Sequence, residues 1–269
     1  MTYSAMELSA YGGRPVETFE FNRESVQFWR YTSADRDVTV SGNIYAAVPI
    51  KRSRIESGSD VERNAVELEC ASTVSFVQEF IAYPPTDRIS VVIRRYHDGD
   101  GQIASIWVGR VVNVSFRGEK VKIRCESSVA SLKRPTLRRL YQITCPHVLY
   151  GAACGLDRMT WRISAVLTAV SGMTLTAAAF ATGDDRLKGG YVEISLSGYY
   201  NKRFITDHNG TTITTNMALP GASVGLAVGV YPGCTHSLAI CNNRFANRAN
   251  YGGYPFIPDK NPMTGSQIF

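Results

Sequence analysis

The sequence has no stretch of about 20 apolar residues of the kind that spans a bilayer, and no basic start followed by an apolar run of the kind that directs secretion. It also lacks a Gly-X-Ser-X-Gly nucleophile elbow, a phosphate-binding glycine loop and a His-Glu-X-X-His motif. We therefore expect a non-enzymatic protein that matures in a reducing cytoplasm. In that setting, paired cysteines are more often metal ligands or redox groups than disulfides.

The size and charge of the chain indicate a basic protein with more than one compact unit. With 269 residues, 44% of them hydrophobic, two or three units with cores of their own are expected. Lysine and arginine exceed aspartate and glutamate by 29 − 23 = 6, and the densest basic stretch is Lys133–Arg139. Nucleic-acid binders often gather such charge in one stripe, so a zinc-stabilised nucleic-acid-binding protein is one hypothesis. It predicts binding that weakens steeply with salt.

Residues 16–127 have the pattern of an all-β domain, with short apolar and β-branched runs bounded by turn residues. One helix is expected inside it, because Ser75-Phe-Val-Gln78 resembles a capping box and Pro84-Pro85 ends the helical spacing. Two Asp-Gly pairs at 98–101 predict a hairpin. The strands expected around and after this hairpin are 89–96, 103–108, 110–116 and 119–126.

Residues 161–233 have the pattern of a second β-rich unit. Asn209-Gly210 between strand-like runs is a strong hairpin signal, and Ser171-Gly172 marks another turn. The strands expected here are 163–170, 173–177, 191–196, 203–206 and 211–215. The unit begins just after one pair of cysteines and ends just before another, as would a small domain inserted into a loop of a metal module.

Four cysteines form two pairs, Cys145 with Cys154 and Cys234 with Cys241, separated by eight and six residues. Zinc knuckles and ribbons usually space paired cysteines by two to four residues, because a tight turn then offers both sulfurs to one ion. A cubane iron–sulfur cluster offers a separate iron to each of four cysteines and accepts looser loops. The spacing alone favours a cluster over zinc only modestly, and four unrelated cysteines remain an alternative.

The two other cysteines, Cys70 and Cys125, continue the alternating apolar sets of two expected strands, so we expect both to be core thiols. Each metal-site pair begins with Cys-X-His, which puts His147 and His236 in equivalent places. Either histidine could donate an N–H to a cluster sulfur, replace a cysteine as ligand, or form hydrogen bonds at a subunit or domain boundary. A redox or hydrolytic enzyme that uses the cluster or a Cys–His pair is a further hypothesis, although no orienting Asn or Asp is evident.

Three segments carry a family resemblance: Cys145–Asp157, Tyr231–Cys241 and Tyr251–Pro258. They resemble the tail-tip, or baseplate, hub proteins of siphophages and gene transfer agents, a family related to the minor tail protein L of phage lambda. Tyr31–Asp37 and Ser131–Arg139 also match, so the resemblance runs over nearly the whole chain.

This resemblance implies a virion protein of the tail tip, assembled in the bacterial host cytoplasm. It implies a homotrimeric ring between the distal tail protein at the end of the tail tube and the central fibre, or host-recognition, protein, with no specific nucleic acid. It also implies a [4Fe-4S] cluster on the four cysteines of the two pairs. On the residues alone, zinc stays the alternative metal, and His147 and His236 stay candidate neighbours of the site.

The fold class that we predict is mainly β. A β-rich hub domain, 1–144, is followed by an iron–sulfur C-terminal module, 145–160 plus 234–269, which carries the inserted small β-barrel-like domain, 161–233. A cluster that joins two distant segments would hold a module with too little core of its own.

Overall fold

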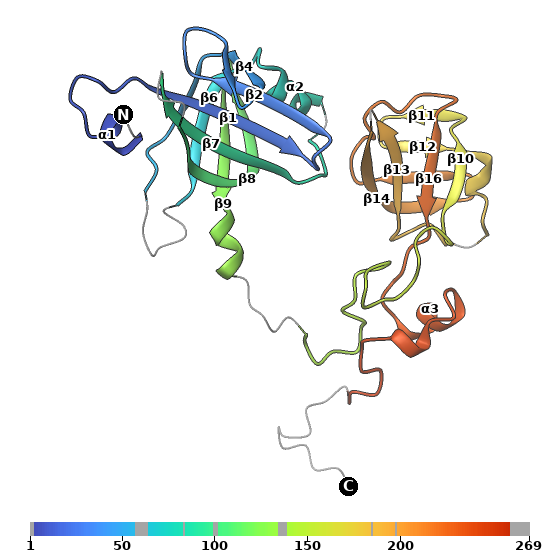
Figure 1. The fold of residues 1–269 in the computed structure, drawn as a ribbon. Helices are drawn as coiled ribbons and strands as arrows, with labels where there is room; N and C mark the ends of the chain where they lie inside the picture. The colour runs from blue at the N-terminus through green and yellow to red at the C-terminus, as the bar shows by residue number, and fades with distance from the viewer. Residues whose placement is uncertain are drawn as a thin grey trace. The chain divides into compact units, whose positions relative to one another are not determined.

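The computed structural model describes residues 3–56, 64–82, 84–98, 102–133, 139–183, 185–196 and 198–258. The chain forms two compact units, residues 1–134 and 135–269, each built around a β-sheet (Figure 1). The prediction of a mainly β protein is therefore confirmed, whereas the boundaries of the three predicted domains stay a prediction. No helix among the described residues is long and apolar enough to cross a membrane.

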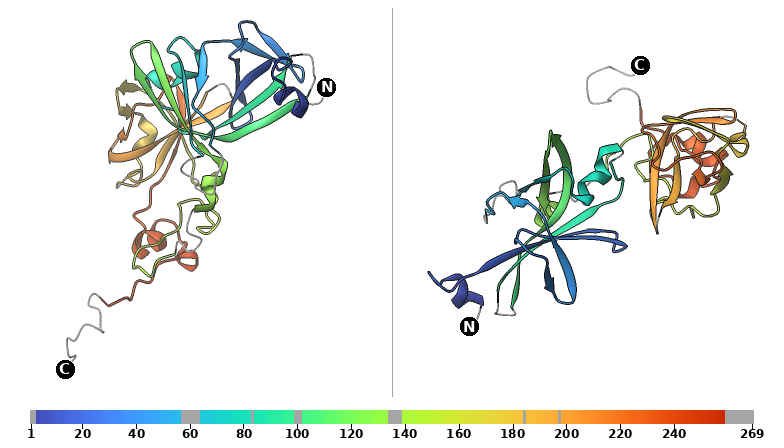
Figure 2. Two further views of the ribbon diagram at one scale, coloured as in Figure 1. Left: turned by 90° about the vertical axis from the view of Figure 1, so that its left-hand side faces the viewer. Right: turned by 90° about the horizontal axis from the view of Figure 1, so that it is seen from above.

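The first unit contains a nine-stranded sheet in the order β3-β4-β2-β1-β7-β8-β9-β6-β5. All neighbouring strands are antiparallel except β2 and β4, and the sheet is strongly curled (Figure 2). The elements of this unit are α1 (Tyr3–Glu7), β1 (Pro15–Arg23), β2 (Gln27–Thr32), β3 (Val38–Val40), β4 (Asn43–Ala47), β5 (Ile50–Arg52), β6 (Val66–Ala71), α2 (Ser75–Ala82), β7 (Ile89–His97), β8 (Ile103–Arg117), β9 (Lys120–Ser127) and η1 (Ser128–Lys133).

The predicted helix is α2, and it closes the core of the first unit. Phe76 is fully buried, and its ring stacks on that of Phe21 from β1 with 4.1 Å between centroids. The hydroxyl of Ser75 lies 2.8 Å from the phenol oxygen of Tyr31 and hydrogen-bonds to it. The helix therefore begins where the sequence predicted, with Ser75 bonded to the sheet.

The predicted hairpin joins β7 to β8, and its Asp-Gly turn lies outside the described residues. The expectation of two strands, 103–108 and 110–116, is wrong, because β8 runs unbroken through Gly109. A Cβ atom at Gly109 would lie 2.2 Å from the Glu126 carbonyl oxygen and 2.2 Å from the Trp107 ring. Glycine is needed there because the Trp107 ring and β9 pack against its backbone.

The second unit contains a seven-stranded antiparallel sheet in the order β10-β16-β13-β14-β15-β12-β11. Its elements are β10 (Ile163–Val166), β11 (Ala169–Ser171), β12 (Thr174–Thr176), η2 (Ala178–Phe180), β13 (Tyr191–Leu196), β14 (Tyr199–Asn209), β15 (Thr212–Thr215), β16 (Ala227–Tyr231), α3 (Leu238–Asn243) and η3 (Arg248–Asn250). We call the part from β10 to β16, residues 163–231, the barrel.

The sheet of the barrel curves back on itself at a strand interruption that the sequence pattern did not predict. Residues 163–170 were expected to form one strand, but they form β10 and β11, which stand at opposite ends of the sheet order. At the break, Leu167 and Thr168 donate their backbone N–H groups to Leu226 and Thr176. The two ends of the sheet are thus joined by two residues. The hairpin predicted at Asn209-Gly210 is confirmed, with Gly210 at φ +57°.

Candidate metal centre

All six predicted site residues line one pocket in the second unit. Cys145 and Cys154 lie on the irregular segment before the barrel, Cys234 follows β16, and Cys241 lies on α3. His147 and His236 line the same pocket, together with Leu149, Leu156, Phe245, Asn247 and Asn250. The fold therefore brings together two cysteine pairs that 79 residues separate in the sequence.

The first pair is held by a compact turn after Tyr150. Cys154 and Gly155 both donate their backbone N–H groups to the carbonyl of Gly151, at 3.0 Å. Gly155 has φ +71°, a conformation that glycine adopts without steric cost. The phenol of Tyr150 donates to the carbonyl of Pro232 at 2.8 Å, which fixes this turn beside the segment that carries the second pair.

The second pair is positioned by the end of the barrel and by a capped helix. The backbone of Gly233 packs directly against the backbone of Lys188–Gly190. A Cβ atom at Gly233 would lie 1.9 Å from the carbonyl oxygen of Lys188, so glycine is needed there. The hydroxyl of Ser237 accepts a hydrogen bond from the N–H of Ile240, which caps α3. Cys241, one turn into this helix, is 8% exposed.

An aromatic cluster joins the cysteine-bearing segments to the barrel. The Tyr150 ring lies 6.0 Å from that of Tyr231 and 6.3 Å from that of Phe245, which in turn lies 5.0 Å from Trp161. The hydroxyl of Tyr231 donates to the buried carboxylate of Glu193 at 2.5 Å. The buried polar groups of Tyr231 and Glu193 thus have a hydrogen-bond partner inside the barrel.

Hydrogen bonds connect the two cysteine pairs directly. The backbone N–H of Cys145 donates to the carbonyl of His236 at 2.8 Å, and Nδ1 of His236 lies 2.9 Å from the carbonyl oxygen of Cys145. The backbone N–H of His236 also points at the sulfur of Cys234, 3.3 Å away. His236 has φ +60°, so this reciprocal contact holds a non-glycine residue in a left-handed conformation.

Asn247, which the sequence did not single out, links one cysteine of each pair. Its side-chain Nδ2 donates to the carbonyl of Cys154 at 2.7 Å and lies 3.8 Å from the Cys154 sulfur. Its own carbonyl lies 3.2 Å from the sulfur of Cys241, and its N–H donates to the carbonyl of Cys241 at 3.0 Å. Asn250 donates to Oδ1 of Asn247, which fixes the orientation of the amide.

Gly252 also contacts a cysteine sulfur, and the sequence signal that could have found it is the run Tyr251-Gly-Gly-Tyr254. Its backbone N–H lies 3.4 Å from the sulfur of Cys145. A Cβ atom at Gly252 would lie 2.5 Å from Nε2 of His147. Only glycine lets this amide approach Cys145 while His147 keeps its place.

The two histidines have different hydrogen-bond states despite their equivalent positions in sequence. Nε2 of His147 accepts from the Arg139 guanidinium at 3.2 Å, so its Nδ1 must be the N–H that donates to the carbonyl of Asn250. Nδ1 of His236 donates to a carbonyl too, which leaves its Nε2 with a lone pair. In the neutral state, His147 has no ring nitrogen left for the pocket, whereas His236 can offer Nε2.

The pocket disfavours the deprotonated form of two of its cysteines when no metal is bound. Burial raises the pKa of Cys234, and the backbone N–H of His236 only partly offsets this. Burial also raises the pKa of Cys241, with a further increase from the charges of the other three thiolates. Cations that bound these sulfurs would remove this repulsion.

Four cysteines around one pocket are the usual ligand set of a [4Fe-4S] cluster and also occur in structural zinc sites. Zinc needs all its sulfurs about 2.3 Å from one point, and no three Cys, His, Asp or Glu side chains in the described part of the chain are placed to hold one ion. Four cysteines are the usual ligands of a [4Fe-4S] cluster, which gives each sulfur its own iron. The cavity measures about 20 Å³, roughly the space of one water molecule, so a cluster would require the cysteine-bearing segments to move apart.

The remaining predicted features lie elsewhere. Cys70 and Cys125 are core thiols of the first unit, 3% and 0% exposed, as predicted. Burial raises their pKa values to about 11 and about 12, which makes them poor nucleophiles and ligands. Of the basic stretch Lys133–Arg139, residues 134–138 lie outside the described residues, and Arg139 contacts His147.

Comparison with known families finds two matches along the chain. Residues 16–157 match the family described as baseplate hub protein, N-terminal attachment domain. Residues 187–261 match the family described as phage conserved hypothetical protein BR0599. The first match covers more than half of the 269 residues and includes Cys145 and Cys154, and the second includes Cys234 and Cys241.

Two similar proteins show how much of the chain the similarity covers. An uncharacterized protein of Xylella fastidiosa (strain 9a5c) is 28% identical in an alignment of 185 residues that covers 61% of this chain, and this chain spans only 38% of the length of that protein. A chain in the solved virion of a native gene transfer agent (GTA) particle has the same fold, with a TM-score of 0.80 at 19% identity. That match covers 99% of this chain and 96% of the other.

Proposed function

We propose that this chain, which belongs to the baseplate hub protein family through its N-terminal attachment domain, is a structural hub of a phage-like tail tip. In this role it forms a trimeric ring that joins the tube end, with its distal tail protein, to the central fibre protein. The observation that carries the proposal is the family match over residues 16–157. The gene transfer agent virion chain of the same fold supports it over the whole length.

A [4Fe-4S] cluster on Cys145, Cys154, Cys234 and Cys241 is the second part of the proposal. It is supported by the common pocket and by the backbone N–H groups of His236 and Gly252 near two of the sulfurs. The cluster would supply cross-links between the segments before and after the barrel. The role that we propose for it is structural, because the segments that carry the four cysteines have little apolar core of their own: among their described residues, the buried hydrophobic side chains are Cys241 and Phe245.

Metal content tests the cluster. The chain purified without oxygen should contain about four iron and four sulfide per protomer, and Cys234→Ser should lose both. Cys70→Ala is the matched control, because Cys70 is a buried thiol in the first unit and its loss should leave the metal content unchanged. One zinc per protomer, or no metal, would refute the cluster and leave the hub role standing.

Images of assembled tails test the hub. Electron cryomicroscopy of particles that carry this chain should show three copies in a ring at the tube end. Native mass spectrometry of the released tip should give the mass of three chains. A chain found elsewhere in the particle, or in another copy number, would contradict this arrangement.

A further inference from the structure

Strand β8 in the first unit is longer than the strand beside it. It pairs with β7 only from Ile103 to Arg110, and with β9 from Gly109 to Arg117. Beyond Arg110, β8 therefore has one strand neighbour. Among the described residues, no backbone hydrogen bond joins 111–117 to any segment other than β9. This half of β8 presents an open strand edge with unpaired main-chain donors and acceptors.

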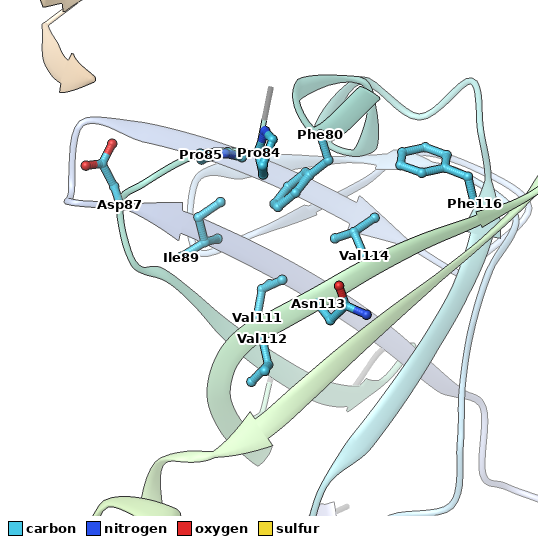
Figure 3. A pocket seen from close by; sticks show the side chains of 10 residues that line it. All are labelled: Phe80, Pro84, Pro85, Asp87, Ile89, Val111, Val112, Asn113, Val114 and Phe116. Atoms are coloured by element: carbon cyan, nitrogen blue, oxygen red, sulfur yellow. The ribbon is translucent and has the colours of Figure 1, made fainter. Parts of the chain in front are cut away.

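A groove runs beside this open edge. Figure 3 shows its lining, which comes from α2, from the connection between α2 and β7, from the first residue of β7 and from β8. Most of the lining side chains are apolar, including Phe80, Val112, Val114 and Phe116, and the cavity measures about 440 Å³. Val112 is 56% exposed and Phe116 is 39% exposed. We call this feature the β8 groove.

The charges in and around the β8 groove restrict what it can bind. Asp87, the one charged residue of its lining, already receives two hydrogen bonds from the buried guanidinium of Arg23, at 2.9 and 2.7 Å. Next to the lining in sequence stand Glu79, which lies 3.8 Å from the guanidinium of Arg23, and Arg88 and Arg117; all three are exposed. The floor therefore suits an apolar segment, and the two arginines suit acidic residues at its ends.

We propose that the β8 groove binds an extended apolar segment of a different tail protein, flanked by acidic residues, which adds to the sheet as a strand beside Val111–Phe116. Strand addition satisfies the open main-chain groups, while the apolar side chains of the lining contact side chains of the added strand. The strands at the sheet ends of this chain, β3, β5, β10 and β11, have three or four residues. They are too short to cover the six residues of the edge. The open half of β8 in a second copy is long enough, but it is flanked by Arg110 and Arg117 and not by acidic residues, so we assign the strand to another protein.

The register shift between Val111 and Asn113 is a second observation that favours a binding role for this edge. A bulge turns the strand and often ends pairing or re-aims side chains at a binding surface. Here it lies where β8 leaves β7. The family match through this region is described as an attachment domain, so a binding edge on it deepens the proposed hub function and rests on it.

Hydrogen exchange in assembled tails tests the β8 groove, with the purified chain as reference. We expect the backbone amides of 111–117 that face away from β9 to exchange at least tenfold more slowly in the tail. The variant Val112→Glu should reduce incorporation of the chain into tails at least tenfold. The control Val108→Glu changes an exposed valine, 43% accessible, on the paired half of the same strand outside the groove, and it should incorporate normally.

The outcomes separate this inference from the function on which it rests. Tails that lack the wild-type chain would overturn the hub proposal. Tails that contain it with unchanged exchange at 111–117, or that accept Val112→Glu as readily as Val108→Glu, would overturn only the strand addition. Protection already present in purified, self-associated chain would mean that a second copy occupies the groove, and would overturn the assignment to a different protein. Circular dichroism of Val112→Glu confirms that the variant is folded.

Discussion

Within the second unit, the barrel and the cysteine segments, defined as residues 145–160 and 234–258, are held together in different ways. The barrel has a continuous apolar core that includes Phe180, Ile205 and Val230, each 0% exposed. Among the described residues of the cysteine segments, the buried hydrophobic side chains are Cys241 and Phe245 alone. A segment with so little core needs another source of stability, and four thiols around one pocket supply a site for it.

The largest expected effect in this comparison comes from removing one sulfur. Cys241→Ser should abolish metal binding, and the cysteine segments should lose their protection from amide exchange while the barrel keeps its own. Bound metal contributes on the order of 10 kcal/mol in small zinc domains, so its loss exceeds what the local hydrogen bonds can offset. Iron content and hydrogen exchange measure both parts.

Cys125→Ala is the control for this experiment, because Cys125 is a fully buried thiol of the first unit. It should keep the iron and the protection of residues 238–252. If Cys241→Ser kept its protection from amide exchange at residues 238–252, the cysteine segments would be stable without metal. The proposed difference between them and the barrel would then be contradicted.

The reverse experiment weakens the barrel core. Phe180→Ala should destabilise the barrel by roughly 3–5 kcal/mol, because it removes a fully buried ring. The cluster absorbance should persist until the barrel unfolds in denaturant, and circular dichroism follows the barrel in the same samples. The matched control Phe204→Ala removes a ring that is 51% exposed on β14, and should change stability by less than about 0.5 kcal/mol. Equal effects of the two variants would contradict the assigned core.

A smaller effect is expected at Asn247, where hydrogen bonds rather than packing connect the cysteine pairs. Asn247→Ala leaves the carbonyl of Cys154 without this donor and should cost roughly 1–3 kcal/mol locally. The variant should bind iron but lose it faster to a chelator. Asn243→Ala on the exposed surface of α3 is the control and should release iron at the wild-type rate. Equal rates in all three proteins would show that Asn247 does not hold the site.

The sequence could predict the cysteines of the site because their pairing and spacing are local patterns. It could not predict Asn247, since its contact with Cys154 joins residues 93 positions apart and depends on how the chain leaves the barrel. In the first unit, the sequence predicted two strands on either side of Gly109, and a glycine inside a strand weakens it and often marks a bulge. The Trp107 ring that covers Gly109 is visible only in three dimensions.

The smallest expected effects separate the two histidines, which the sequence made equivalent. His236→Asn keeps a side-chain N–H for the carbonyl of Cys145 and suits the positive φ of that position, but it removes Nε2. His236→Ala removes both. If His236 acts only through the bond to Cys145, then Asn should behave as wild type and Ala should destabilise the cysteine segments by about 1 kcal/mol.

The spectrum of the reduced cluster completes this test. A change in its electron paramagnetic resonance in His236→Asn, with the iron content preserved, would assign Nε2 to a direct contact with the cluster. His147→Asn is the matched variant, since both ring nitrogens of His147 are engaged by Arg139 and Asn250 and none is left for the pocket. It should leave the spectrum unchanged. A spectral change in His147→Asn alone would reverse the assignment, and would mean that the hydrogen bonds of His147 break when metal binds.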